Sequence, residues 1–76
     1  MRVLLHGLET KEQINKVLAA TRMSSERKIE ALHDYFVKGL NLSGAAALNS
    51  LDPDKFGEVV KKIHQVAFEL ANKGEL

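Results

Sequence analysis

The sequence predicts a small all-α domain of four helices, and three observations support this fold class. Apolar residues recur at three- and four-residue steps in several stretches, which is the period of an amphipathic helix. Residues that commonly cap helix starts precede these stretches. The chain has 76 residues and is 45% hydrophobic, which is enough for one folded domain over residues 1–76 but leaves a monomer of marginal stability.

The first helix is expected to begin at Thr10, whose hydroxyl can accept a hydrogen bond from the amide of Gln13 in a capping box. It should end near Thr21 or Arg22. Its apolar face consists of Ile14, Val17 and Leu18.

The second helix should be capped by Ser24 or Ser25, which puts Glu26 in the first turn, where the helix dipole favours an acid. We expect it to run to about Lys38, because Gly39 readily adopts the left-handed conformation that ends a helix. Its inward face consists of Ile29, Leu32 and Phe36, with His33 beside them.

The third helix is short. After a turn at residues 40–42, Ser43 is expected to cap a helix that ends at Leu48. Three consecutive alanines, 45–47, would let a neighbouring helix approach closely. Residues 49–51 then form a second turn.

Asp52-Pro53 predicts the start of the fourth helix, because aspartate caps well and proline suits the first helical position. The helix should stop near Gly74. Residues 43–70 thus have the outline of a helix-turn-helix, with 43–48 as the positioning helix and 53–72 as the recognition helix. The apolar stripe of the fourth helix consists of Phe56, Val59, Val60, Ile63, Val66, Ala67 and Leu70.

Several classes of protein are disfavoured. The chain lacks cysteine, so it has neither disulfides nor thiolate metal sites, as expected in a reducing compartment. The segment Met1–Leu8 is too short for a signal peptide, and no stretch is long enough to cross a bilayer, so we expect a cytoplasmic protein. His6, His33 and His64 do not have metal-ligand spacing, and no catalytic motif is present. We therefore expect no enzyme activity, metal, cofactor or small-molecule substrate.

Residues 25–39, SERKIEALHDYFVKG, resemble the S-[ED]-x-x-I-x-A-[LM]-x-D-Y-[LF]-V-x-G stretch of the PapB-like regulators of fimbrial adhesin biosynthesis. The upstream TKEQ of residues 10–13 and the downstream FGEVVKKI of residues 56–63 are also similar to segments of that family. The resemblance covers roughly residues 8–70, and the same layout is similar to the KorA or TrfB-like plasmid repressors.

The resemblance implies a transcriptional regulator that binds double-stranded DNA through a helix-turn-helix and forms a homodimer or larger oligomer on promoters. The controlled genes would belong to a fimbrial operon or a plasmid. This chain departs from the family at Gly57, where a serine is usual, and at Lys62 and Gln65, where arginines are usual.

The candidate DNA contacts are polar residues that lie off the predicted apolar stripes and could meet phosphates or base edges. The net charge is only +1, whereas DNA-binding domains usually have a clear basic excess. A solvated surface is the alternative explanation for the charged candidates, and helix capping is the alternative for the candidates near the third helix. The candidates are Lys55, Gly57, Lys61, Lys62 and Gln65 in the fourth helix, Asn41 and Ser43 near the third, and Arg27 and Lys28 in the second.

The alternative function is a helical protein-interaction module without DNA binding, which the near-neutral fourth helix favours. Residues 53–76 hold four lysines and four acids. Tyr35, Phe68 and the apolar segment Met1–Leu8 are candidates for contacts between subunits, since they lie beside the inward stripes or outside the predicted helices.

Overall fold

The computed structural model describes Gly7 and residues 9–74. It consists of α1 (Lys11–Thr21), α2 (Glu26–Phe36), α3 (Leu42–Leu48) and α4 (Pro53–Asn72), and the described residues include no strand. The all-α prediction is therefore confirmed. The predicted subunit contact of segment 1–8 lies outside the described residues, apart from Gly7.

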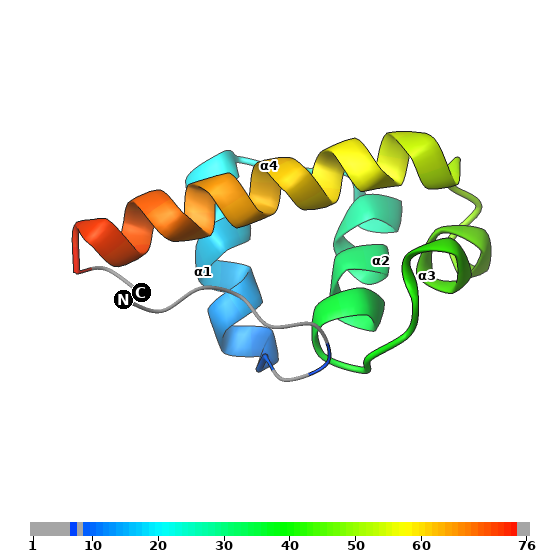
Figure 1. The fold of residues 1–76 in the computed structure, drawn as a ribbon, viewed down its shortest axis with the longest axis horizontal. Coiled ribbons are helices and arrows are strands. Elements are labelled where there is room, and N and C mark those ends of the chain that lie inside the picture. Colours follow the sequence, from blue (N-terminus) through cyan, green and yellow to red (C-terminus); the bar gives the residue numbers. More distant parts are fainter. Residues whose placement is uncertain (1–6, 8, 75–76) are drawn as a thin grey trace.

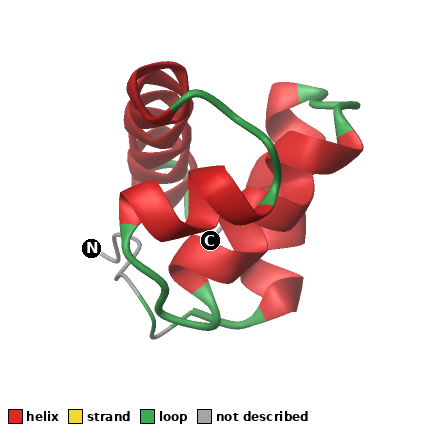
Figure 2. Ribbon diagram, turned by 90° about the vertical axis from the view of Figure 1, so that its right-hand side faces the viewer, coloured by secondary structure: helices red, strands yellow, loops and turns green. Residues whose placement is uncertain are grey.

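The long helix α4 lies across the other helices (Figure 1). Helices α1 and α2 are neighbours that run in opposite directions, and α4 crosses both of them. Helix α3 lies at the end of the molecule where α4 begins. Figure 2 looks nearly along α4 and shows α3 running across the view, so α3 and α4 meet at a large angle after a turn over residues 49–52.

One apolar core joins the four helices, and α2 lies at its centre. Besides apolar residues, α2 buries His33 and Asp34, whereas Ile29, which was expected inside, is only half-buried. The predicted stripe of α4 is confirmed, with Val59, Val66 and Leu70 partly buried at its edges. The core consists of Ile14, Val17, Leu18, Ala31, Leu32, Phe36, Ala45, Ala46, Phe56, Val60, Ile63 and Ala67.

Three of the predicted helix starts are confirmed by their capping hydrogen bonds. Thr10 Oγ1 accepts from the amide of Gln13 at 3.3 Å. Ser25 Oγ accepts from the amide of Lys28 at 3.4 Å. Asp52 Oδ1 accepts from the amide of Asp54 at 2.9 Å, with Pro53 as the first residue of α4. Each cap pairs an amide that would otherwise lack a partner in the first turn.

The start of α3 was predicted wrongly. Asn41 caps this helix through its Oδ1, which accepts from the amide of Gly44 at 2.6 Å, and Ser43 lies inside the helix as its second residue. Both side chains can cap a helix. The earlier start lets Leu42 pack against the core from the first position of α3, which a start after Ser43 would not provide.

The end of α2 was also predicted too late. The helix stops at Phe36, and the carbonyl of His33 accepts from the amides of both Val37 and Lys38, at 2.9 and 3.2 Å. The first bond has the α-helical spacing of four residues and the second spans five, so one carbonyl pairs both amides where the helix ends. Gly39 has the expected left-handed conformation, with a φ of 82°, but it lies two residues after the C-cap Val37 and does not end the helix directly.

Asp34 connects α2 to α3. Its side chain is almost fully buried, and Oδ2 accepts from Asn49 Nδ2 at 2.9 Å. Lys38 Nζ lies 3.3 Å from Oδ1, and the backbone carbonyl of Asp34 accepts from the amide of Leu40 at 3.0 Å. Asn49 Nδ2 also donates to the carbonyl of Ala45, at 2.9 Å. Asp34 therefore connects α2 both to the loop before α3 and to Asn49 at the end of α3.

We expect Asp34→Ala to lower the free energy of unfolding by roughly 1.5–3 kcal/mol, because it removes a buried hydrogen bond to a charged group. Lys38→Met is the matched control for the ion pair, in which Lys38 is the exposed partner, and should cost less than about 1 kcal/mol. Urea unfolding measures the free energy of unfolding of both variants. The same measurement on Asn49→Ala and on the double variant Asp34→Ala, Asn49→Ala gives the coupling free energy between the two side chains. A loss for Asp34→Ala no larger than that for Lys38→Met would contradict this role.

Candidate nucleic-acid interface

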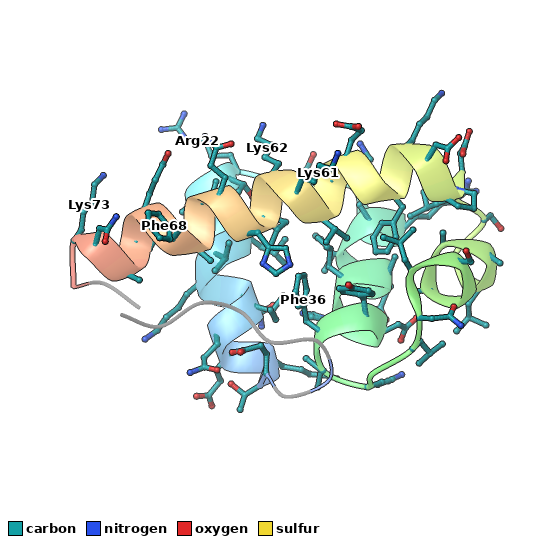
Figure 3. All side chains as sticks on the ribbon, viewed as in Figure 1. Arg22, Phe36, Lys61, Lys62, Phe68 and Lys73 are labelled. Carbon is teal, nitrogen blue, oxygen red and sulfur yellow. The ribbon has the colours of Figure 1, made fainter. Side chains whose placement is uncertain are left out.

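A row of cations follows one flank of α4. Lys55 and Lys62 in α4 and Lys73, the C-cap just after it, are exposed and are separated by seven and eleven residues, so at ~100° per residue they lie within roughly 20° of one another around the helix axis. Figure 3 shows Lys62 and Lys73 projecting past the same edge of α4, together with Arg22. We call Arg22, Lys55, Lys62 and Lys73 the basic flank. Glu69 lies at a similar angle around α4, so the basic flank also contains an acid.

Arg22 reaches the basic flank because α1 ends beneath α4. It is the C-cap of α1 with a φ of 56°, and its amide donates to the carbonyl of Ala19 at 3.3 Å. Its side chain is exposed. The sequence contains no signal that would place it beside α4, because its position depends on the crossing of α1 and α4.

Lys28 and Lys55 come together although they are distant in sequence. Both line a pocket of about 240 Å³ between the start of α2 and the start of α4. Arg27, the other predicted contact on α2, is exposed but does not line this pocket, since it is rotated by ~100° around the helix from Lys28.

The remaining predicted contacts of α4 lie on other surfaces. Lys61 is adjacent to Lys62 and is therefore turned by ~100° from the basic flank. Lys61 Nζ lies 3.9 Å from Glu58 Oε1, and both side chains are at least 77% exposed, so the pair is weak. Gln65 is seven residues after Glu58 and shares its outer face.

Gly57, Asn41 and Ser43 lie on the α3 side of α4. A Cβ atom at Gly57 would contact Leu42 Cδ1 at 3.9 Å, so Gly57 faces α3. Asn41 is exposed, but its side-chain oxygen already caps α3, and Ser43 is exposed two residues further on. The candidate contacts that the sequence suggests are therefore divided among several surfaces.

The first turns of α4 are acidic. Asp52, Asp54 and Glu58 are all exposed there, whereas Lys55 is the one lysine between them. Acids at a helix start stabilise the helix through its dipole, but they repel phosphate. The end of α4 that would enter a groove in a helix-turn-helix complex is thus less basic than the flank.

Two histidines have lowered pKa values. Burial lowers the pKa of His33 below its ordinary value of 6.5, and Lys11 and Lys38 lower it further while Glu30 and Asp34 oppose this. His33 Nε2 lies 3.0 Å from Asn15 Oδ1, which accepts a hydrogen bond from the ring in the tautomer that has the proton on Nε2. His64 is exposed as a residue, but partial burial of its ring, which meets Phe36 edge-on at 5.2 Å, also lowers its pKa.

The described residues contain no group of three or more His, Cys, Asp or Glu side chains that could hold a metal ion. Among the same residues, none of the helices is both long enough and apolar enough to cross a membrane. Comparison with known proteins finds no matching family model, curated protein or solved structure. The resemblance to the PapB-like regulators therefore remains an expectation from residues 25–39 and their flanking segments.

The histidines predict acid sensitivity. Because the pKa values of these histidines are lowered in the folded state, the unfolded chain binds more protons than the folded chain. The free energy of unfolding therefore has its full value above pH 6.5 and decreases as the pH falls through 6.5 towards the lowered pKa values. We expect the melting temperature to decrease between about pH 7.5 and about pH 5, and His64→Gln to reduce that decrease. Thermal unfolding followed by circular dichroism measures both. An identical pH dependence in His64→Gln and in the wild type would exclude a contribution from His64.

Proposed function

We propose that the protein is a cytoplasmic, non-enzymatic regulator that binds double-stranded DNA as an oligomer, and that the basic flank contacts the phosphate backbone. The observation that supports this function is the alignment of Lys55, Lys62 and Lys73 along one flank of α4, extended by Arg22 from α1. Transcriptional control is the output that the family resemblance implies.

The dimensions of the basic flank suit a nucleic-acid backbone. Lys55 and Lys73 are eighteen residues apart, so the row is ~27 Å long at 1.5 Å per residue. Phosphates of one strand recur every ~3.4 Å along the duplex axis, and a straight row of this length follows several of them. Such contacts position a protein on DNA without reading its sequence.

The number of cations sets the expected strength of binding. Each neutralised phosphate contributes about −0.9 to the dependence of log affinity on log salt, so four cations give a slope of about −3.6 at most for one protomer. Specific binders of this kind usually make more contacts. Two or more protomers on adjacent sites would supply them, which supports the oligomer in this proposal.

A protein-interaction module is the second candidate function. Two large apolar side chains favour it, since Leu48 is 68% exposed and Phe68 is 46% exposed. They lie on different helices, α3 and α4. Tyr35 is a weaker candidate for a contact with another chain, because it is half-buried and its ring meets Phe36 edge-on at 4.9 Å within the protomer. An interaction module would bind its partner with little dependence on salt, in contrast to a DNA-binding protein.

We expect Lys62→Ala to weaken DNA binding and to reduce the salt slope by about 1, because it removes one phosphate contact. Lys61→Ala is a closely matched control, since it removes the same charge from the next residue on a different face of α4. Fluorescence anisotropy of a labelled duplex, titrated at several salt concentrations, gives both slopes.

The two variants separate the outcomes clearly. A larger loss for Lys62→Ala than for Lys61→Ala supports contact through the basic flank. Equal losses would show that net charge, and not this flank, governs binding. Absence of DNA binding by the wild-type protein at low salt would reject the proposed function and favour the interaction module.

A further inference from the structure

The pocket beside Lys55 lies where three segments meet: the start of α2, the turn between α3 and α4, and the first turns of α4. Its volume is about 240 Å³. Ser50, in the turn, has a φ of 58°, which brings the chain sharply from α3 into α4 at the edge of the pocket. The lining residues are Lys28, Ser50, Leu51, Asp52, Lys55, Phe56 and Val59.

The pocket combines an apolar floor with a cationic rim. Phe56 is buried, and Leu51 and Val59 are partly buried against the core. The rim carries the exposed lysines Lys28 and Lys55, neither of which forms an ion pair with a carboxylate of the described residues.

The acid in the pocket does not cancel these charges. Asp52 is the one carboxylate in the lining, and its Oδ1 atom accepts from the amide of Asp54 at 2.9 Å. The lining therefore holds two lysines and one carboxylate, and that carboxylate also caps α4. The local balance favours a ligand that brings a negative charge.

We infer that this pocket binds a small organic anion with an apolar body and a single carboxylate. Pockets for drug-sized ligands have volumes of ~300–1,000 Å³, so this smaller one suits a single aromatic ring or a short branched chain. The apolar body would lie on Leu51 and Val59, and the carboxylate would lie between Lys28 and Lys55. The ligand would join α2 to α4. This inference does not depend on DNA binding, although Lys55 belongs to both surfaces.

Benzoate is the probe, because it combines one ring with one carboxylate. Titration of the full-length, ¹⁵N-labelled chain with millimolar sodium benzoate should shift the backbone amides of residues 50–59 in a saturable way. Benzamide has the same shape without the charge and should bind roughly fivefold more weakly. Inorganic phosphate tests whether charge alone suffices, and it should not produce the shifts at Leu51 and Val59.

Charge-matched variants locate the site. Lys28→Gln and Lys55→Gln should each weaken benzoate binding by roughly threefold, since contacts of exposed charges are weak. Lys61→Gln and Lys73→Gln remove the same charge outside the pocket and should leave the affinity unchanged. Absence of saturable shifts at residues 50–59, equal binding of benzamide, or equal effects of all four variants would each overturn the inference. Because no DNA is present, these results are independent of the proposed function.

Discussion

The arrangement of this domain depends on one buried carboxylate. Asp34 lies on the central helix, and its hydrogen bond to Asn49 fixes the end of α3 against α2. Because only residues 49–52 separate α3 from α4, the position of α3 also sets where α4 begins. A buried carboxylate without partners would be costly, so the hydrogen bonds that satisfy Asp34 select this arrangement over others that bury the same apolar residues.

Helix α4 contributes to the stability of the domain and also carries the proposed DNA contacts, because its faces have different neighbours. One face packs on α1, α2 and α3 and contains the apolar stripe. The adjoining flank carries Lys55, Lys62 and Lys73, whose long side chains extend into solvent beside the partly buried Val59 and Val66. A rotation of α4 around its axis would expose the stripe and bury these lysines. The packing of the core therefore also fixes the direction in which the basic flank faces.

The proposed DNA surface differs from the arrangement that a simple helix-turn-helix interpretation suggests. In that interpretation the start of the second helix approaches the bases. Here that start carries Asp52, Asp54 and Glu58, and the cations lie along the side of the helix. Contact along the side of the helix favours the phosphate backbone over the bases. Lys61 lies outside this surface, on a face of α4 that also carries the acid Glu58, with which it forms a weak ion pair. The pocket at Lys28 and Lys55 then lies at one end of the basic flank.

The sequence by itself determined the helices, because caps and apolar periodicity act over a few residues. Thr10, Ser25 and Asp52 cap as predicted, and the stripe of α4 is the one that its spacing indicates. The start of α3 could not be predicted locally, because Asn41 and Ser43 can both cap a helix. The packing of Leu42 against the core decides between these two caps. Tertiary structure alone decided which polar residues share a surface. Arg22 lies beside the α4 lysines, and Lys28 lines the same pocket as Lys55, because helices distant in sequence pack together there. No local pattern encodes the angle at which such helices cross.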